Sequence, residues 1–216
     1  MHKWIRNVWR EHKSFFVFIA LMLVFRSAVA DWNQVPTGSM KPTILEGDRI
    51  LVNKMAYDLR VPFTHISLVK RADPARGDII VFDSKVSDKR LVKRVIGIPG
   101  DIVSLRENEL VVNGQQINYT EVASTATTID KQEDLLGVEY VIRTSKQSSR
   151  WSNFPPVKVP EGYLLALGDN RDNSADSRVI GFIPRNEIVG RSRHVAFSVD
   201  YENHYIPRKD RFFDAL

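Results

Sequence analysis

The longest uninterrupted apolar run of the chain lies close to its N-terminus. Residues 15–25 read FFVFIALMLVF, with no polar position among them. A helix that packs on a globular core alternates apolar and polar faces, so this run is not typical of a core helix. It predicts a segment that lies in a membrane, over residues 14–30.

Two interpretations fit this N-terminal pattern. A basic start, a short apolar run and the ending Ala28-Val29-Ala30 are the marks of a cleaved secretory signal. The alternative is a membrane anchor, which would be short against the roughly 20 residues of a spanning helix and would place Arg26 at the outer interface. The basic residues before the run are Lys3, Arg6, Arg10 and Lys13. Their excess predicts a cytoplasmic segment over residues 1–13 and places residues 31–216 outside the membrane.

Beyond residue 31 the apolar positions form short runs bounded by Gly, Pro, Asn and Asp. The runs are RILVNK, DIIVF, LVKRVIGI, IVSL, ELVVNG, YLLALGDN and EIVGRSRHVAF. They have the length of strands and are rich in Val and Ile, and no long segment keeps a helical period. The sequence therefore predicts a mainly β domain. Asn113-Gly114 is a two-residue hairpin signal, and residues 106–109 predict a second turn.

Residues 103–160 are interpreted as an insertion in this domain. From about residue 120 the segment is mostly polar and contains the breaks PP and PEG. Such a segment lacks the apolar positions of an independent core, so we expect a loop-rich β insertion rather than a separate domain.

Composition narrows the classes of function. The chain has 216 residues, 43% hydrophobic and 26% charged, which suits one core with an insertion. It contains no cysteine, which excludes disulfides, thiolate catalysis and cysteine zinc sites. The net charge of +5 is spread along the chain without a basic helical face or stacking aromatics, so no nucleic-acid partner is expected.

A serine nucleophile needs a base, and the histidines offer none in a suitable motif. His2 and His12 precede the membrane segment, while His65, His194 and His204 lie in no glycine-rich or strand-terminal pattern. We interpret the last three as surface or packing residues.

Lys93 is an alternative base. In a strand, Leu91, Lys93 and Val95 share one face, which places the ammonium between apolar neighbours. A lysine has a pKa of about 10.4, so burial must lower it by roughly 3 units to give a useful base. The competing interpretation is a strand lysine whose ammonium reaches solvent.

The candidate nucleophile is Ser39 in the segment PTGSMKPT. Gly38 permits backbone geometry that a side chain would forbid, and Pro42 keeps Lys41 out of the helical region. Thr37 could direct its hydroxyl to an oxyanion beside the Ser39 backbone N–H. The competing interpretation is an ordinary polar loop.

A third polar segment, GDNRDNSADSR at residues 168–178, follows an apolar strand. Asp176 and Arg178 are two residues apart, which in extended chain places them on one face for an ion pair. Ser174 could orient a lysine amine. The alternative is an Asp/Asn-rich turn or a calcium loop, but the glutamate and central glycine of an EF-hand are missing.

Five segments in this order resemble the motifs of the bacterial type I signal peptidases, or leader peptidases. They are PTGSMKPT, GDRILVNK, RGDIIVF, KRVIGIPGD and GDNRDNSADSR, and the resemblance covers most of residues 33–101 and 161–192. It implies a β-sheet, barrel-like catalytic core behind one N-terminal transmembrane helix. The implied activity is a membrane-bound serine endopeptidase that removes signal peptides from exported preproteins with a Ser/Lys dyad. The implied location is the outer, periplasmic face of the bacterial cytoplasmic membrane.

The resemblance also implies roles for single residues. Ser39 matches the nucleophile, Lys93 the general base, Thr37 the oxyanion hydroxyl and Ser174 the serine that orients the lysine. The residues implied as structural support are Asp169, Asp176 and Arg178, and those implied for the substrate pocket are Val35, Pro36, Ile44, Ile50 and Val92. The implied partners are signal peptides and the lipid bilayer, without nucleic acid, metal or cofactor.

The resemblance favours the uncleaved anchor, since Ser39 lies nine residues after Ala30 and within roughly 30 Å of it. The ending SAVA remains a candidate for self-cleavage. Three other functions stay open. One is a Ser/Lys peptidase dedicated to one secretion or conjugation substrate, and another is a noncatalytic membrane-tethered β module. The third is a self-cleaving repressor, but residues 1–30 leave no room for the DNA-binding domain that it needs.

Overall fold

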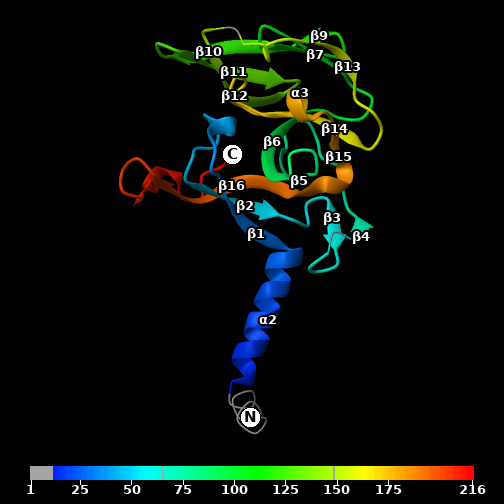
Figure 1. The fold of residues 1–216 in the computed structure, drawn as a ribbon, viewed down its shortest axis with the longest axis vertical. Helices are drawn as coiled ribbons and strands as arrows, with labels where there is room; N and C mark the ends of the chain where they lie inside the picture. Colours follow the sequence, from blue (N-terminus) through cyan, green and yellow to red (C-terminus); the bar gives the residue numbers. More distant parts are fainter. Residues whose placement is uncertain (1–11, 65, 148) are drawn as a thin grey trace.

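An antiparallel sheet with the strand order β1-β2-β16-β5-β6-β14-β15, and β17 beside β16, forms the centre of the computed structural model (Figure 1). The structure describes residues 12–64, 66–147 and 149–216. The strands of this sheet are β1 (Ala30–Gln34), β2 (Asp48–Asn53), β5 (Ile79–Ser84), β6 (Lys89–Gly97), β14 (Tyr163–Leu167), β15 (Ile183–Pro184), β16 (Ile188–Asp200) and β17 (Ile206–Pro207). The path has two ends, β1 and β15, so the predicted barrel-like core is an open, curled sheet.

Both faces of the middle of this sheet are covered. Ile79 and Val81 of β5 pack in one apolar cluster, and Ile80 and Phe82 pack in another. A strand that is buried on both faces has a continuous apolar sequence, which explains the unbroken run DIIVF. The mainly β prediction is confirmed, and the apolar runs predicted as strands lie in β2, β5, β6, β7, β8, β14 and β16.

The predicted insertion forms two further sheets (Figure 1). One has the order β13-β7-β8-β9, with β7 (Ile102–Arg106), β8 (Glu109–Val112), β9 (Gln115–Gln116) and β13 (Phe154–Lys158). The other has the order β10-β11-β12, with β10 (Asn118–Ser124), β11 (Thr128–Leu135) and β12 (Val138–Ser145). The insertion is β structure as predicted, but its expected loop-rich character is wrong for residues 118–145, which are mostly strand.

The outer faces of these strands are polar, which explains the error. Leu135, Tyr140 and Ile142 supply the inner face and join the same core cluster as β7 and β8. Glu133 occupies an inward position as well and is completely buried, so the apolar alternation is interrupted in the sequence.

The two turns predicted from the sequence are confirmed. Glu107 and Asn108 have positive φ between β7 and β8, and Asn113 and Gly114 have positive φ between β8 and β9. Two central residues with positive φ are the mark of a type I′ hairpin turn.

The apolar N-terminal run is helical. Helix α2 (Lys13–Ala28) extends away from the sheets and continues into β1 after Val29 (Figure 1). Its apolar side chains are largely exposed, Leu21 at 64%. Within the described part of the chain, no helix combines the length and the hydropathy that a membrane crossing requires. The predicted anchor over 14–30 stays a prediction, and the basic residues Lys3, Arg6 and Arg10, with His2, lie outside the described residues.

The remaining elements are short. The hairpin of β3 (Asp58–Arg60) and β4 (Ser67–Lys70) lies beside the upper end of α2 (Figure 1). Helix α3 (Ser177–Ile180) follows β14, and three single turns of 3₁₀ helix are η1 (Gly38–Met40), η2 (Arg185–Glu187) and η3 (Lys209–Arg211).

Candidate active site

The candidate nucleophile lies on the turn η1. Ser39 is held between Gly38 and Met40, and the side chain of Met40 is buried in the core below. The loop that carries the turn is closed at its base, where Val35 N donates to Asp48 O at 2.9 Å. Lys41 is extended at ψ 143°, as expected before Pro42. The turn therefore presents the Ser39 hydroxyl above a fixed apolar base.

The predicted reason for Gly38 is wrong. Its φ is not positive, so its backbone is open to any residue. A Cβ at Gly38 would instead meet the side-chain ends of Glu46 and Lys41 at 3.0 and 3.1 Å.

Lys93 reaches Ser39 from β6. Its Nζ lies 2.8 Å from Ser39 Oγ and donates to Val92 O at 2.9 Å. The lysine is only 2% exposed. Leu91 and Val95 pack in one cluster with Ile80, which pairs with Lys93 in the sheet, as the predicted alternation requires. The structure thus joins the two residues of the predicted dyad.

Burial lowers the pKa of Lys93 to about 8. The carboxylates of Asp176 and Asp169 oppose this shift, and Arg178 adds to it. Each of these carboxylates has an arginine partner of its own, Arg178 for Asp176 and Arg94 for Asp169. Neither is therefore left as a free counterion for a protonated Lys93, and desolvation determines the direction of the shift.

The loop at residues 168–173 is hydrogen-bonded to the turn. Asn170 donates through Nδ2 to Gly38 O at 2.9 Å, and its backbone N donates to Ser39 O at 3.1 Å. A Cβ at Gly168 would lie 2.5 Å from Ser39 O and 2.2 Å from Ser174 Oγ. Only a glycine at position 168 allows this approach, because Ser39 O is backbone and cannot move aside without moving the nucleophile.

Ser174 lies against Gly168, next to the site. Its Oγ is buried and has no hydrogen-bond partner of ordinary geometry among the described residues, although it lies close enough to Asp176 to help lower that pKa. The predicted orienting bond from Ser174 to Lys93 is absent from this structure, and the role stays a prediction.

The predicted ion pair of Asp176 and Arg178 is present. Arg178 Nε and Nη2 donate to the two carboxylate oxygens at 2.8 and 2.6 Å. Burial by itself raises the pKa of Asp176, but the hydrogen bonds and charge of the Arg178 guanidinium outweigh burial, so the pKa is lowered. The chain is not extended as predicted: Asp176 is the N-cap of α3, and it also accepts from Gly168 N at 3.0 Å. The pair therefore fixes the glycine that touches the nucleophile turn.

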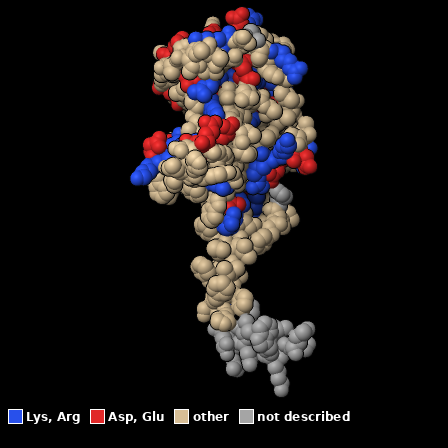
Figure 2. Space-filling view, turned by 60° about the vertical axis from the view of Figure 1, so that its left-hand side comes forward, with Lys and Arg blue, Asp and Glu red and all other residues tan. Residues whose placement is uncertain are grey.

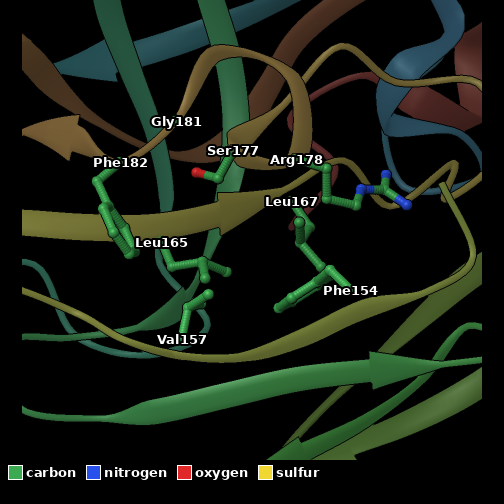
Figure 3. A pocket seen from close by; sticks show the side chains of 8 residues that line it. All are labelled: Phe154, Val157, Leu165, Leu167, Ser177, Arg178, Gly181 and Phe182. Atoms are coloured by element: carbon green, nitrogen blue, oxygen red, sulfur yellow. The ribbon is translucent and has the colours of Figure 1, made fainter.

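An apolar cavity of about 220 Å³ lies behind this ion pair. Its walls include Leu165, Leu167 and Phe182, and in Figure 3 the Arg178 guanidinium points away from these side chains. The charged end of Arg178 therefore lies outside the apolar cavity, where it pairs with Asp176.

Asp169 belongs to a second buried pair. Arg94 donates to its carboxylate at 2.9 and 2.7 Å, and Thr43 Oγ1 donates at 2.6 Å. Arg94 also lies over the ring of Tyr140, 4.0 Å from the centroid. This pair links the strand of the lysine to the insertion and to the loop after the nucleophile.

A groove of about 470 Å³ lies beside Ser39 and Lys93. It is lined by residues of 32–37 on one side and 89–93 on the other, including Val35, Pro36, Thr37 and Val92. Ile44 and Ile50, predicted as pocket residues, do not line it: both are completely buried in the cluster under Val35 and Val92. The exposed Thr37 makes no capping bond to the turn, so its hydroxyl is available to the groove.

Both walls of the groove are strand edges. Among the described strands, β1 is the end strand of the sheet and pairs with β2 alone. β14 pairs with β6 only from Arg94 onward, so residues 89–93 pair with β5 on one side. Backbone groups of both edges are thus available to an extended peptide.

The histidines do not compete as bases. His194 lies on β16 and His204 in the turn after it, and neither lines the groove. His65 lies outside the described residues.

Several residues of this arrangement were not predicted as site residues. They are Asn170, Gly168, Arg94 and Thr43 around the turn, and Arg211, Asp48, Arg171 and Glu133 behind it. Asn170 and Gly168 belong to the polar segment that the sequence singled out. The buried pairs Arg211–Asp48 and Arg171–Glu133 join distant segments, which no sequence spacing indicates.

Comparison with known proteins gives consistent matches. A family model described as signal peptidase, peptidase S26, matches residues 8–197. The signal peptidase I of Pseudomonas fluorescens is 39% identical over 199 residues, which cover 83% of this chain and 69% of that protein. The signal peptidase I of Rickettsia typhi is 35% identical over 225 residues, covering 89% and 81%. A solved signal peptidase I from Enterococcus faecalis is 28% identical and covers 56% of this chain and 97% of its own, at a TM-score of 0.37.

Proposed function

The chain belongs to the signal peptidase family, peptidase S26, and we propose that it cleaves signal peptides with Ser39 as nucleophile and Lys93 as general base. It is a serine endopeptidase that acts on the signal peptides of preproteins. The observation that supports the residue roles is the 2.8 Å approach of a buried lysine amine to a serine hydroxyl beside an open groove.

The reaction starts with neutral Lys93. As Ser39 Oγ attacks the scissile carbonyl, its proton passes to Lys93 Nζ, and a tetrahedral oxyanion forms. The Thr37 hydroxyl and the Ser39 backbone N–H stabilise this oxyanion. The C–N bond then breaks, the leaving amine takes the proton from Lys93, and an acyl-enzyme remains. Neutral Lys93 next takes a proton from water as the water oxygen attacks the ester carbonyl. The acyl C–Oγ bond then breaks, and Lys93 returns the proton to Ser39 Oγ.

The surrounding charges suit this role. A lysine with a pKa of about 8 is partly neutral at physiological pH, whereas an exposed lysine is almost wholly protonated. The ion pairs of Asp176 and Asp169 keep both carboxylates occupied. Asp176, Arg178 and Asp169 thus support the base, and Ser174 is a candidate to orient its amine during the reaction.

The substrate lies extended between β1 and the first half of β6, pairing with their free edges as an added strand. Val35, Pro36 and Val92 offer an apolar wall next to Ser39. Ile44 and Ile50 support that wall from below. A shallow apolar wall of this kind selects small side chains at the first and third positions before the cut.

Residues 14–30 anchor the enzyme in the bacterial cytoplasmic membrane, with residues 1–13 in the cytoplasm and residues 31–216 on the outer, periplasmic face. Helix α2 joins β1 through Val29 alone, so the helix is tied to the wall of the groove. Val29 O accepts from Lys54 N, and Ala30 pairs with Asn53. Because this backbone is already paired, the SAVA ending is protected against self-cleavage.

The test compares processing of a purified preprotein in detergent by the wild type, Ser39→Ala and Lys93→Ala. Ser124→Ala and Lys158→Ala serve as controls, because both residues are exposed, lie in the insertion and do not line the groove. We expect processing to be lost in the first two variants and kept in the controls. Processing by folded Ser39→Ala or Lys93→Ala at the wild-type rate would refute the proposed roles and favour a noncatalytic β module or another active site.

A further inference from the structure

A second, basic cavity lies where α2 meets the sheet. It has a volume of about 160 Å³, and its lining includes Lys54, Arg60, Arg90, Ser27, Phe63 and Thr64. Figure 2 shows basic side chains on the part of the body next to α2, while α2 itself carries none over its apolar length. Three cations thus surround a small cavity directly above an apolar helix.

The cationic side chains at the cavity and their neighbours outnumber the carboxylates with which they pair. Lys54 shares Asp31 with Arg26, at 3.5 and 2.7 Å. Arg60 shares Asp58 with Arg185, at 3.1 and 2.7 Å. Arg90 pairs with Asp83 at 2.7 Å. The shared carboxylates leave the cavity with an excess of positive charge, which favours an anion.

Arg60 also has an unused donor. Its Nη2 donates to Asp58 and to the backbone oxygen of Ile188, but its Nε is buried and has no hydrogen-bond partner among the described residues. The side chain is 11% exposed. This unpaired N–H adds to the positive potential at the cavity that Arg60 lines.

One hydroxyl of the cavity points to the same chemistry, whereas Thr64 Oγ1 already donates to Val61 O at 3.0 Å. Ser27 Oγ accepts from Phe63 N at 2.6 Å, which leaves its own proton for another acceptor. A phosphate group offers several acceptor oxygens and matches a guanidinium fork. A group of that size fits a cavity of about 160 Å³.

The surroundings indicate a lipid as the source of the phosphate. The β3–β4 hairpin exposes Phe63 at 69%, together with Ile66 and Leu68, and the Ser27 bond ties it to the end of α2. On β1, Trp32 is exposed and lies under the Arg26 guanidinium, 4.5 Å from the ring centroid. Exposed apolar side chains next to cations and a tryptophan are the pattern of a membrane interface.

We propose that this cavity binds the phosphate of an anionic phospholipid, while the β3–β4 hairpin contacts the lipid surface beside α2. The proposal rests on the anchoring of residues 14–30 in the membrane. Arg90 lines both this cavity and the groove, so a bound headgroup fixes the height of the groove above the bilayer.

The test uses the full chain in nanodiscs or mixed micelles of dioleoylphosphatidylcholine, with and without dioleoylphosphatidylglycerol. The phosphatidylglycerol that stays bound per protein is measured by mass spectrometry for the wild type and for Lys54→Gln/Arg60→Gln. Lys146→Gln/Lys158→Gln removes the same charge from exposed residues of the insertion, which line neither the cavity nor the groove, and is the control. At roughly fivefold in affinity for each basic residue at an anionic surface, we expect about 25-fold weaker binding in the first variant and little change in the control.

A second arm separates lipid from free phosphate. Inorganic phosphate is added at millimolar concentration without lipid, and the unfolding midpoint is followed. We expect no stabilisation of the wild type. Stabilisation by inorganic phosphate that the double variant loses would overturn the lipid assignment, and equal retention of phosphatidylglycerol by wild type and double variant would overturn the site.

Folding of the double variant is checked by circular dichroism. If it does not fold, Lys54→Gln alone replaces it, with an expected loss of about fivefold. The activity of the wild type and Ser39→Ala in lipid-free detergent is measured in parallel. Wild-type activity that Ser39→Ala lacks, combined with equal lipid binding by all variants, would refute the lipid site and leave the proposed function intact.

Discussion

Lys93 Nζ and Ser39 Oγ lie 2.8 Å apart, although 54 residues separate the two in the chain. The approach needs three things at once: the turn after β1, the buried middle of β6, and a glycine at position 168 that lets the polar loop press on the turn. The pair is therefore formed in the absence of substrate, and each of these supports can be tested separately.

Replacing Lys93 by Met should stabilise the fold while abolishing activity. The pKa of Lys93 falls from 10.5 in the unfolded chain to about 8 in the fold, so between these pH values the unfolded chain binds more protons. The free energy of unfolding of the wild type therefore rises between pH 8 and pH 10.5. Below pH 8 it is about 3 kcal/mol lower than it would be if Lys93 kept its unfolded-state pKa in the fold. At pH 7, allowing for the lost hydrogen bonds, we expect Lys93→Met to gain about 2 kcal/mol.

Thermal unfolding in detergent measures this difference at pH 7 and pH 10. The gain should shrink at the higher pH, because the folded-state lysine is neutral there and the unfolded chain is close to its own pKa of 10.5, so little of the cost of deprotonation remains. A variant that is less stable than the wild type at pH 7 would show that the buried amine carries no such cost.

Gly168→Ala and Gly38→Ala should differ sharply although both glycines flank the nucleophile. A Cβ at position 168 meets backbone at Ser39 O, whereas one at position 38 meets only the ends of flexible side chains. We expect kcat to fall at least about 100-fold in Gly168→Ala, because the nucleophile is displaced, and less than about tenfold in Gly38→Ala. Steady-state cleavage of a signal-peptide substrate measures both, and equal losses would contradict this account of the loop.

Thr37→Val tests the oxyanion role of the exposed hydroxyl. The loss of one oxyanion donor lowers kcat by about 100-fold or more, and KM should change little because the side-chain shape is kept. Thr37→Ser retains the hydroxyl and should recover most of the rate. If Thr37→Val and Thr37→Ser have the same kcat, Thr37 is not a donor to the transition state.

Arg211 should be a strong determinant of stability. It donates to both oxygens of Asp48, which is completely buried, and to Thr43 O at 3.0 Å. Arg211→Met leaves the carboxylate buried without its cation, for which we expect a loss of about 3–5 kcal/mol in the free energy of unfolding. Combining it with Asp48→Asn should restore part of the loss.

The exposed pair of Arg90 and Asp83 provides the comparison. Its members are about two-fifths exposed, so Arg90→Met should cost less than about 1 kcal/mol. Denaturant unfolding measures both variants. A loss for Arg211→Met as small as that for Arg90→Met would show that the C-terminal segment does not stabilise the nucleophile loop.

The strands could be predicted because their signals are local: apolar runs bounded by turn residues define them. Ser39 and Lys93 were candidates from their own segments, but their pairing as a dyad was implied only by the resemblance to the signal peptidases. Alternation along β6 also predicted the burial of Lys93 correctly.

Other features depend on contacts between distant segments. Glu133 can lie in the core because it forms an ion pair with Arg171 at 2.7 Å. This buried carboxylate interrupts the apolar alternation of β11, so the sequence of the strand resembles that of a polar loop. Arg211 forms an ion pair with Asp48, although the two are 163 positions apart in the chain. The role of Gly168 also became visible only once the polar loop and the nucleophile turn were placed together.

The most direct test of the lysine base is the dependence of kcat/KM on pH, measured with a signal-peptide substrate that has no group titrating near pH 8. Neutral Lys93 is the reactive form, so kcat/KM should rise with pH along a limb of unit slope and level off above an apparent pKa of about 8. A limb centred near pH 6.5, the value of a histidine, or one near pH 10.4, the value of an exposed lysine, would contradict a desolvated Lys93 as the base.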